Sequence, residues 1–175
     1  EDCLTILEMG FGTGLNALLT FHESEKRAQY VHYIGLEAFP PSEAEWRAMN
    51  YQKQVNFEEV AEIYEKLHTK TKKKMISLNE FFVLEKRNEK LQNLKLSDSS
   101  IDLIYYDAFG PRVQEELWSL EIFEKLFKML KSGGYLVTYC AKGQVKRDLK
   151  KAGFIVESLP GPPGKREMTR ARKIG

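Results

Sequence analysis

The sequence predicts an α/β protein with a Rossmann-like, mainly parallel sheet that is covered by helices on both faces. Apolar runs of strand length alternate along the chain with amphipathic runs of helix length, which is the pattern of βαβ units. The first apolar run, residues 4–7, leads into the glycine turn GFGTG (residues 10–14) and then into a helical stretch. A glycine turn between a strand and a helix is where α/β proteins bind nucleotide-like cofactors.

Seven strands are expected, at residues 3–9, 31–37, 81–85, 101–107, 135–140, 154–159 and 167–172. The run at 101–106 is apolar at nearly every position, which indicates a central strand. Five helices are expected between the strands, at residues 15–21, 42–49, 57–67, 119–130 and 144–151. The polar, lysine-rich residues 66–74 are expected to form a solvated connection.

The last helices and strands have clear boundary signals. Ser119 is an expected N-cap, and Ile122, Leu126 and Leu130 repeat every four residues along one helix face. Gly133-Gly134 is expected to end this helix and lead into the next strand. The last two strands are joined by a short segment rich in proline and glycine, so they are expected to form an antiparallel hairpin.

Composition predicts one soluble domain spanning residues 1–175. The chain is 42% hydrophobic and 30% charged, as in ordinary globular proteins. No apolar run approaches the roughly 20 residues that span a bilayer, and no signal peptide is recognisable. Because the chain begins at Glu1, almost at the first strand, an upstream segment is expected to be missing.

Cysteine and histidine usage predicts a cytoplasmic protein without a metal site. Cys3 and Cys140 lie in apolar, strand-like runs, so they are expected to be buried thiols rather than a disulfide. The three histidines are scattered along the chain and form no cluster with metal-ligand spacing.

The glycine turn predicts S-adenosylmethionine as the cofactor. Dinucleotide sites use G-x-G-x-x-G, whereas this turn is G-x-G-x-G, and Glu8 stands two residues before Gly10. A carboxylate there would repel a diphosphate but could bind the ammonium group of S-adenosylmethionine. Glu37 ends the second apolar run, where an acid binds ribose hydroxyls. The alternative is that the glycines only shape a turn.

A second motif, DAFGP (residues 107–111), directly follows the expected central strand. Open α/β sheets bind ligands at the carboxyl ends of their strands, so Asp107 is expected to face the cofactor. A carboxylate in this place can hold an attacking amine and accept its proton, or it can merely cap a helix or turn. Phe109 and Trp118 could stack on a flat substrate, or they could belong to the core.

Basic residues are concentrated near one end of the chain. Residues 142–173 contain ten Lys or Arg and three acids, which gives a net charge of 10 − 3 = +7. The whole chain has a net charge of +2, so the remaining residues carry 2 − 7 = −5. Such a concentration suggests an anionic macromolecule as the partner. The alternative is a solvated charged face.

With both motifs in place, the sequence resembles the methyltransferase family that completes 5-methylaminomethyl-2-thiouridine at the wobble position of tRNA (the N-terminal domain of MnmC, and stand-alone MnmD). The matching segments are LEMGFGTGLNAL (7–18), GLEAFP (35–40), YYDAFGP (105–111), LWSLEIFEKL (117–126), GGYLVTYCAKGQVKRDLKKAGF (133–154) and PGPPGKREM (160–168). The resemblance implies a class I S-adenosylmethionine-dependent methyltransferase fold, with a seven-stranded sheet whose last strand is antiparallel. It also implies methylation of a 5-aminomethyluridine amine in the tRNA anticodon stem-loop.

The resemblance further implies roles for individual residues. Glu8 would contact the amino acid end of the cofactor, Glu37 its ribose, and Asp107 the reacting amine. The other expected cofactor contacts are Gly10, Phe11, Gly12, Gly14, Asn16, Asn88 and Ala108, with Asp107 itself. Apart from the resemblance, the DAFGP motif and the basic stretch give the expected substrate or RNA contacts, which are Phe109, Trp118, Lys142, Arg147, Lys165 and Arg166.

One region departs from the family pattern. Many members have a Gly-Asp after the third strand, with the acid near the adenine, whereas this chain has Glu85-Lys86-Arg87-Asn88. Glu85 or Asn88 would replace that acid.

Three functions are compatible with these features of the sequence. The first is the tRNA amine methyltransferase, with a separate flavin oxidoreductase acting upstream, because 175 residues leave no room for the flavin domain of the larger family members. The second is a class I methyltransferase for a small amine or a protein, and the third is a non-catalytic RNA-binding module. The acids Glu8, Glu37 and Asp107 together favour an enzyme, and PGPPGKREM beside the basic stretch favours tRNA.

Overall fold

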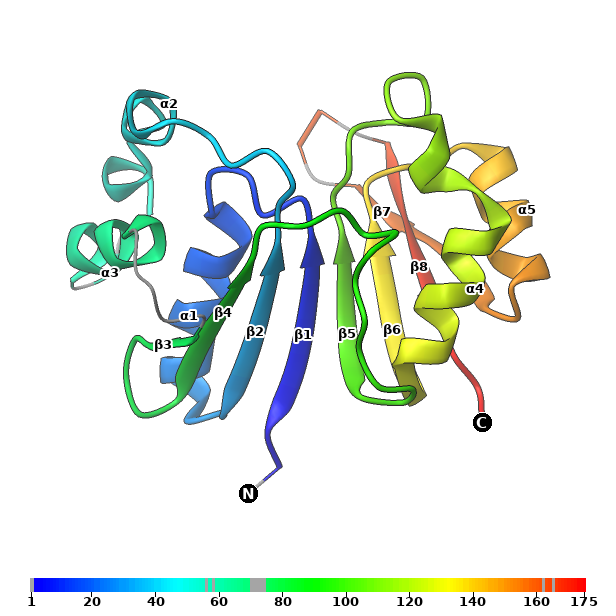
Figure 1. Ribbon diagram of the computed structural model, residues 1–175, viewed down its shortest axis with the longest axis horizontal. Coiled ribbons are helices and arrows are strands. Elements are labelled where there is room, and N and C mark those ends of the chain that lie inside the picture. The colour runs from blue at the N-terminus through cyan, green and yellow to red at the C-terminus, as the bar shows by residue number, and fades with distance from the viewer. Residues whose placement is uncertain (1, 56, 58, 70–74, 162, 165) are drawn as a thin grey trace.

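The computed structural model describes residues 2–55, 57, 59–69, 75–161, 163–164 and 166–175. These residues form one sheet in the order β3-β4-β2-β1-β5-β6-β8-β7, which runs across Figure 1. Its strands are β1 (Leu4–Met9), β2 (Val31–Leu36), β3 (Met75–Ser77), β4 (Phe82–Arg87), β5 (Ile101–Tyr106), β6 (Leu130–Thr138), β7 (Ile155–Pro160) and β8 (Glu167–Arg172). The strands from β4 to β6 in this order are parallel, so their carboxyl ends share the upper edge of the sheet in Figure 1.

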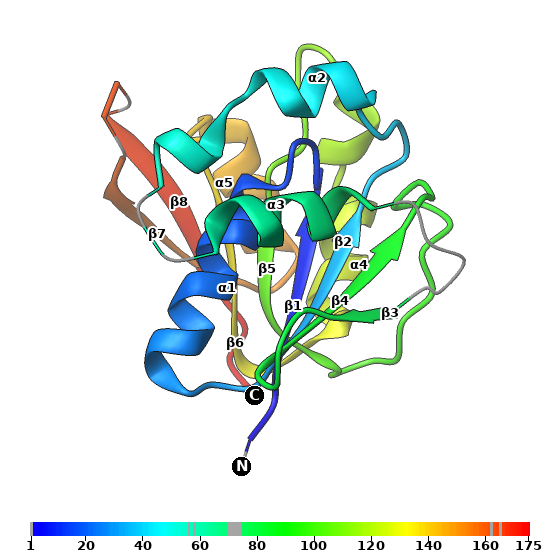
Figure 2. The same ribbon diagram turned by 90° about the vertical axis from the view of Figure 1, so that its left-hand side faces the viewer.

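Helices cover both faces of the sheet. They are α1 (Leu15–Arg27), α2 (Glu43–Ala48), α3 (Val60–His68), α4 (Leu120–Met129) and α5 (Gly143–Lys151), with the 3-10 turns η1 (Tyr51–Lys53) and η2 (Glu115–Trp118). In Figure 1, α4 and α5 lie in front of the sheet and α1 lies behind it, with α3 beside α1 as Figure 2 also shows. Each face buries its own apolar core.

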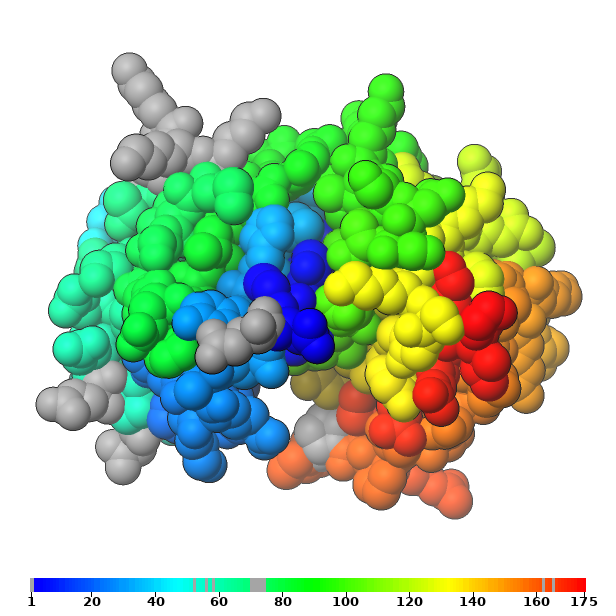
Figure 3. Space-filling model, turned by 90° about the horizontal axis from the view of Figure 1, so that it is seen from below, coloured from blue at the N-terminus to red at the C-terminus, as the bar shows by residue number. Residues whose placement is uncertain are grey.

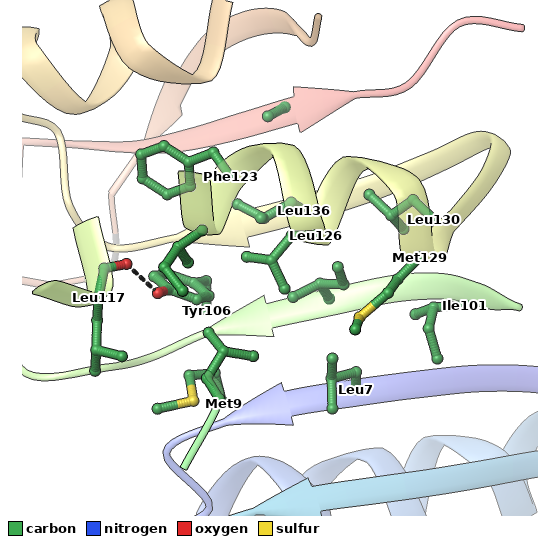
Figure 4. Packing of buried hydrophobic residues seen from close by; sticks show 14 of the residues in the cluster. Leu7, Met9, Ile101, Tyr106, Leu117, Phe123, Leu126, Met129, Leu130 and Leu136 are labelled. Carbon is green, nitrogen blue, oxygen red and sulfur yellow. Dashed lines mark hydrogen bonds between the residues drawn. The ribbon is translucent and has the colours of Figure 1, made fainter. Parts of the chain in front are cut away.

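The core beneath α4 fixes the chain where β5 ends. Side chains of β1, β5, β6 and α4 pack together there, as Figure 4 shows. In the same view, the Tyr106 hydroxyl at the end of β5 donates a hydrogen bond to the Leu117 carbonyl. Trp118, which follows Leu117 in the chain, donates a hydrogen bond from Nε1 to the Phe109 carbonyl at 2.8 Å. Two buried aromatic side chains therefore anchor the loop that follows β5.

The prediction that Gly133-Gly134 ends α4 is wrong. Ser119 caps α4 as predicted, but the helix ends at Met129 and β6 starts at Leu130. Gly133, with a φ of 82°, lies inside β6, where the pairing of β5 with β6 shifts register. The glycines therefore allow an irregularity in a strand rather than a helix end.

The prediction of a C-terminal hairpin is confirmed. β7 pairs antiparallel with β8 along the full length of both strands. β8 enters the sheet between β6 and β7 and is also antiparallel to β6, so the last strand has the predicted direction. Residues 162 and 165 of the connecting turn lie outside the described residues.

Three smaller differences from the sequence predictions concern an additional strand, the start of α3 and the exposure of Cys3. The short strand β3 adds an eighth strand to the seven expected, because it pairs antiparallel with β4 at the sheet edge. α3 begins at Val60 rather than at 57, since Glu59 has a left-handed backbone with a φ of 62°. Cys3 is exposed rather than buried, because it precedes Leu4, where the pairing of β1 with β2 begins.

Candidate active site

The glycine turn carries β1 into α1 beside the end of β5. Its three glycines all have positive φ, from 52° to 85°, and Gly14 is the N-cap of α1. Gly10 also has a close neighbour, because a Cβ there would lie 2.7 Å from the Asp107 carbonyl oxygen. A side chain at this position would collide with that backbone, so the close approach requires glycine.

The three acids singled out in the sequence lie at one edge of the sheet. Glu8 is the next-to-last residue of β1, and Glu37 and Asp107 directly follow β2 and β5. All three line a cavity of about 730 Å³, which we call the cofactor cavity. Its size is typical of small-molecule sites. The cavity is also lined by other residues that the sequence predicted to contact the cofactor or the substrate, namely Gly10, Phe11, Gly12, Asn16, Ala108 and Phe109.

The charged lining of the cofactor cavity is acidic. Glu45 joins the three predicted acids, and the described residues that line the cavity include no Lys or Arg. A dinucleotide would bring its diphosphate among carboxylates with no cation to balance it. S-adenosylmethionine carries an ammonium and a sulfonium group and no phosphate, so the cavity fits this cofactor and disfavours a dinucleotide.

Glu8 is a buried acid with fixed partners. Its side chain accepts hydrogen bonds from Asn16 Nδ2 on Oε1 and from the Tyr33 hydroxyl on Oε2, both at 2.8 Å. Burial raises the pKa of Glu8 to about 8, although these two hydrogen bonds act in the opposite direction. The nearby charges of Asp107 and Glu37 raise the pKa further. A cation entering the cavity would favour the ionised form of this carboxyl.

The Glu37 carboxylate connects the glycine turn with the loop after β2. Its Oε2 accepts a hydrogen bond from the Gly12 N–H at 3.0 Å, and its Oε1 accepts one from the Phe39 N–H at 2.9 Å. The carboxylate is therefore held between the turn and the loop after β2. Phe39 on that loop is 71% exposed and also lines the cofactor cavity, so it offers an aromatic face that the sequence reasoning missed.

Two residues far along the chain hold the glycine turn. The Tyr51 hydroxyl bonds the Thr13 hydroxyl at 2.8 Å, and His68 Nε2 lies 2.9 Å from the Thr13 carbonyl oxygen. His68 stacks on Trp46 with ring centroids 4.4 Å apart, and burial lowers its pKa to about 4. The imidazole is therefore neutral near pH 7, with the Nε2 proton donated to the carbonyl. No local sequence pattern connects these residues with the turn.

Asp107 lies where three cavities meet. Its side chain is exposed, while its backbone N–H donates to the Met9 carbonyl at 3.0 Å. Together with Tyr139, it lines the cofactor cavity and two neighbouring cavities of about 390 and 250 Å³. A carboxylate in this position can face a cofactor on one side and an incoming substrate on the other.

The neighbouring cavities open toward different faces. The larger, which we call the acceptor cavity, lies between the loop after β5 and the start of α5; among its lining residues are Asp107, Arg112, Trp118, Tyr139 and Lys142. The smaller lies behind the sheet between α1, β6 and β8, lined in part by Leu19, Val137 and Met168. Figure 3 shows that the surface is hollowed on that side, between α1 and the β7–β8 hairpin.

The two aromatic side chains predicted to stack on a substrate differ in access. Phe109 is 71% exposed, whereas Trp118 is 6% exposed and packs against Tyr106 and Phe123. Trp118 is thus part of the core that supports the loop after β5, and it also lines the acceptor cavity, so its contact with a substrate stays a prediction. Phe109 is the more exposed of the two rings.

Two predicted cofactor contacts lie away from the cofactor cavity. Gly14 is buried where α1 begins, and Asn88 is exposed beyond the end of β4; neither lines the cavity. Glu85, the alternative to Asn88, is bonded by His32 Nε2 at 2.9 Å and by Arg87 Nε at 2.8 Å. The loop after β2 lines the cavity, whereas the described residues after β4 do not.

The basic stretch is only partly available to a ligand. Lys146 pairs with Glu167 at 3.1 Å, and Arg170 pairs with Glu157 at 2.6 Å. Among the predicted RNA contacts, Lys142 and Arg166 are exposed, and Arg147 is exposed but donates to the Gln144 side chain. Lys165 lies outside the described residues.

The described residues contain neither a metal-binding cluster nor a membrane-spanning helix. No group of three or more His, Cys, Asp or Glu side chains in the described part of the chain is arranged to hold a metal ion. Within the same residues, no helix has both the length and the apolar character that crossing a membrane requires.

Comparison with known proteins identifies the family. Residues 50–174 match a family described as S-adenosyl-L-methionine-dependent methyltransferase, and this match covers most of the chain. The chain belongs to this family. The predictions of a Rossmann-like methyltransferase fold and of S-adenosylmethionine as the cofactor are therefore confirmed.

Individual relatives agree with this assignment. The tRNA 5-methylaminomethyl-2-thiouridine biosynthesis bifunctional protein MnmC of Hydrogenovibrio crunogenus is 31% identical over 95% of this chain and 26% of its own length. The protein of the same name from Stutzerimonas stutzeri is 28% identical over 97% of this chain and 27% of its own length. The chain thus spans about a quarter of the length of these curated relatives.

Solved structures share the fold. MnmC2 from Aquifex aeolicus has a TM-score of 0.71 at 23% identity, over 98% of this chain and 54% of that protein. A methyltransferase from Pyrococcus furiosus has a TM-score of 0.56 at 16% identity, over 98% of this chain and 75% of that protein.

Proposed function

We propose that this methyltransferase transfers a methyl group to the primary amine of a 5-aminomethyluridine at the wobble position of tRNA. The names of its curated relatives support this substrate. The observation that carries the proposal is the place of Asp107, between an acidic cofactor cavity and a second cavity bordered by Arg112 and Lys142. A substrate that combines an amine with phosphates matches this arrangement of charges.

The roles of the residues follow from their positions. When bound, S-adenosylmethionine supplies an electrophilic methyl group on sulfur. Glu8 would bind its ammonium group and Glu37 its ribose hydroxyls, in the cavity that Asp107 also lines. The Asp107 carboxylate would hold the acceptor amine in line and accept the proton that the nitrogen loses as its new N–C bond forms. The bond from sulfur to the methyl group would break in the same step, with S-adenosylhomocysteine as the leaving group.

The reaction would take place in the cytoplasm, after another enzyme has freed the amine. Residues 1–175 would act as one methyltransferase domain in the cytoplasm, where tRNA is the substrate. The amine must be free before it can attack the methyl group. A separate flavin oxidoreductase, acting upstream on the same nucleoside, would produce that free amine.

The direct test is nucleoside analysis. tRNA that carries the 5-aminomethyl group should gain one methyl group when incubated with the protein and S-adenosylmethionine, and the modified nucleoside is identified by mass spectrometry after digestion. The matched control is the same tRNA without the aminomethyl group, which should stay unmethylated. Methylation of free amines or of a protein, with no product on the aminomethyl tRNA, would contradict the proposal and favour the small-amine or protein alternative.

A further inference from the structure

We infer that the target nucleoside enters the acceptor cavity, and that Arg112 and Lys142 on its rim bind the phosphates beside that nucleoside. The inference rests on the proposed function and assigns it a substrate subsite. Arg112 is absent from the sequence-based predictions, because it lies outside the basic stretch and becomes a neighbour of Lys142 only in the fold.

The charges of the two larger cavities differ in kind. The cofactor cavity is lined by acids without a described Lys or Arg, whereas the acceptor cavity has Asp107 as the acid among its described lining residues and two cations, Arg112 and Lys142. An acid beside the cofactor suits an amine, and cations at the rim suit phosphates. A small free amine would use the acid alone, so the two cations favour a nucleic acid.

Both cations are available to a ligand. Arg112 and Lys142 are exposed, and neither forms an ion pair with a residue in the described part of the chain. Other basic residues of the C-terminal stretch differ, because Lys146 and Arg170 are occupied by Glu167 and Glu157. The fold thus neutralises part of the basic stretch and leaves unpaired charge next to the acceptor cavity.

Backbone hydrogen bonds fix the chain at the two positions that carry these side chains. Arg112 lies in a turn where the N–H groups of Val113 and Gln114 both donate to the Gly110 carbonyl, at 2.8 and 3.2 Å. Lys142 is the N-cap residue of α5, and its carbonyl accepts from the Lys146 N–H at 3.1 Å. Two anchored backbone positions therefore flank the opening.

Size and aromatic surface agree with a splayed-out base. The acceptor cavity measures about 390 Å³, which lies within the usual range for small-molecule sites. Phe109 and Val113, on the loop that carries Arg112, are 71% and 73% exposed. RNA-modifying proteins stack unpaired bases on such exposed aromatic side chains. The base next to the target can therefore rest on Phe109 while the target lies in the cavity.

The test compares tRNA binding by Arg112→Ala and Lys142→Ala with the wild type at several salt concentrations. Each substitution should weaken binding and lower the slope of log affinity against log salt by roughly 0.7 to 0.9, the contribution of one phosphate contact. Lys128→Ala is the matched control, since Lys128 is exposed and borders a separate groove on α4.

The outcomes separate this inference from the proposed function. Unchanged affinity and slope in both variants, with a wild type that methylates aminomethyl tRNA, would overturn the inference and leave the function standing. Weakened binding in both variants, with a wild type that transfers no methyl group to that tRNA, would support the RNA-binding rim and overturn the proposed acceptor. A loss as large in Lys128→Ala would show that the rim has no special part in binding and would overturn the inference.

Discussion

Glu8 and Asp107 line the same cavity but lie in opposite environments. Glu8 is 1% exposed, its two oxygens accept hydrogen bonds from Asn16 and Tyr33, and burial raises its pKa. Asp107 is exposed and borders three cavities. A group that binds the same cofactor in every cycle can be buried and fixed, whereas one that meets a large incoming acceptor must stay accessible.

The same contrast extends to the surroundings of these acids. On the Glu8 side, the glycine turn is held by Tyr51 and His68 from α3 and the segment before it. On the Asp107 side, the cavity is bordered by cations on the loop after β5 and at the start of α5. The first side suits a small cationic ligand, and under the proposed function the second would bind an extended anionic one. Changes on one side should therefore leave the function of the other largely intact.

The largest effect is expected from Asp107→Asn. The amide keeps the shape of the side chain but loses its negative charge and its ability to accept a proton. Turnover with aminomethyl tRNA should fall about 100-fold or more, while S-adenosylmethionine affinity measured by calorimetry should fall by a much smaller factor. Asp98→Asn on an exposed loop is the control and should keep wild-type turnover. Wild-type turnover in Asp107→Asn would show that Asp107 has only a structural role.

Glu37→Ala should weaken cofactor binding and leave tRNA binding unchanged. Loss of hydrogen bonds from a charged group should weaken S-adenosylmethionine binding by roughly 1.5–3 kcal/mol, and tRNA affinity should stay near that of the wild type. Calorimetric titration of the cofactor measures the effect, and Glu62→Ala on the exposed face of α3 is the control. Equal cofactor affinity in Glu37→Ala and the wild type would remove Glu37 from the cofactor site.

The pH dependence of stability should reveal the buried acid. The folded pKa of Glu8 is about 8, raised from 4.5, so its contribution to stability is complete below pH 4.5 and is lost as the pH rises toward 8. The folded pKa of His68 is about 4, lowered from 6.5, so its contribution is complete above pH 6.5 and is lost as the pH falls toward 4. The two trends oppose each other between pH 4.5 and 6.5, and Glu8 acts without His68 from pH 6.5 to 8.

In that upper window, Glu8 should lower the free energy of unfolding of the cofactor-free protein by at most about 1.4 kcal/mol per pH unit. Denaturant titrations at several pH values measure this slope. Glu8→Gln cannot ionise, so its slope should be flatter than that of the wild type by the Glu8 contribution. Identical slopes for the two proteins would mean that the pKa of Glu8 is ordinary in the fold.

The smallest effect is expected from Tyr51→Phe, which removes one hydroxyl that holds the glycine turn. Loss of its hydrogen bond to Thr13 should weaken S-adenosylmethionine binding by about 0.5–1.5 kcal/mol, with no change in tRNA affinity. Tyr135→Phe on β6 provides the control, because it removes the same atom from the other half of the sheet. If both variants bind the cofactor as the wild type does, Tyr51 does not position the turn.

Local sequence determined the strand, turn and helix at the start of the chain and the residues that end its parallel strands. The apolar runs specify β1, β2 and β5, and the glycines permit the positive φ values that the turn adopts. Because parallel strands share one edge, the positions of Glu8, Glu37 and Asp107 along the chain sufficed to predict that they meet. These features depend on neighbours in sequence and on a general rule of sheet geometry.

Only the tertiary structure decided the rest of the site, because those contacts join residues that are far apart in the chain. Tyr51 and His68 reach the turn from 38 and 55 residues away, and Arg112 and Lys142 line the same cavity. The burial of Trp118 depends on how α4 packs on the sheet. Which basic residues remain available depends on where β8 enters the sheet, since its pairing places Arg170 opposite Glu157. Such pairings follow from the packing of distant elements, which periodicity and spacing do not encode.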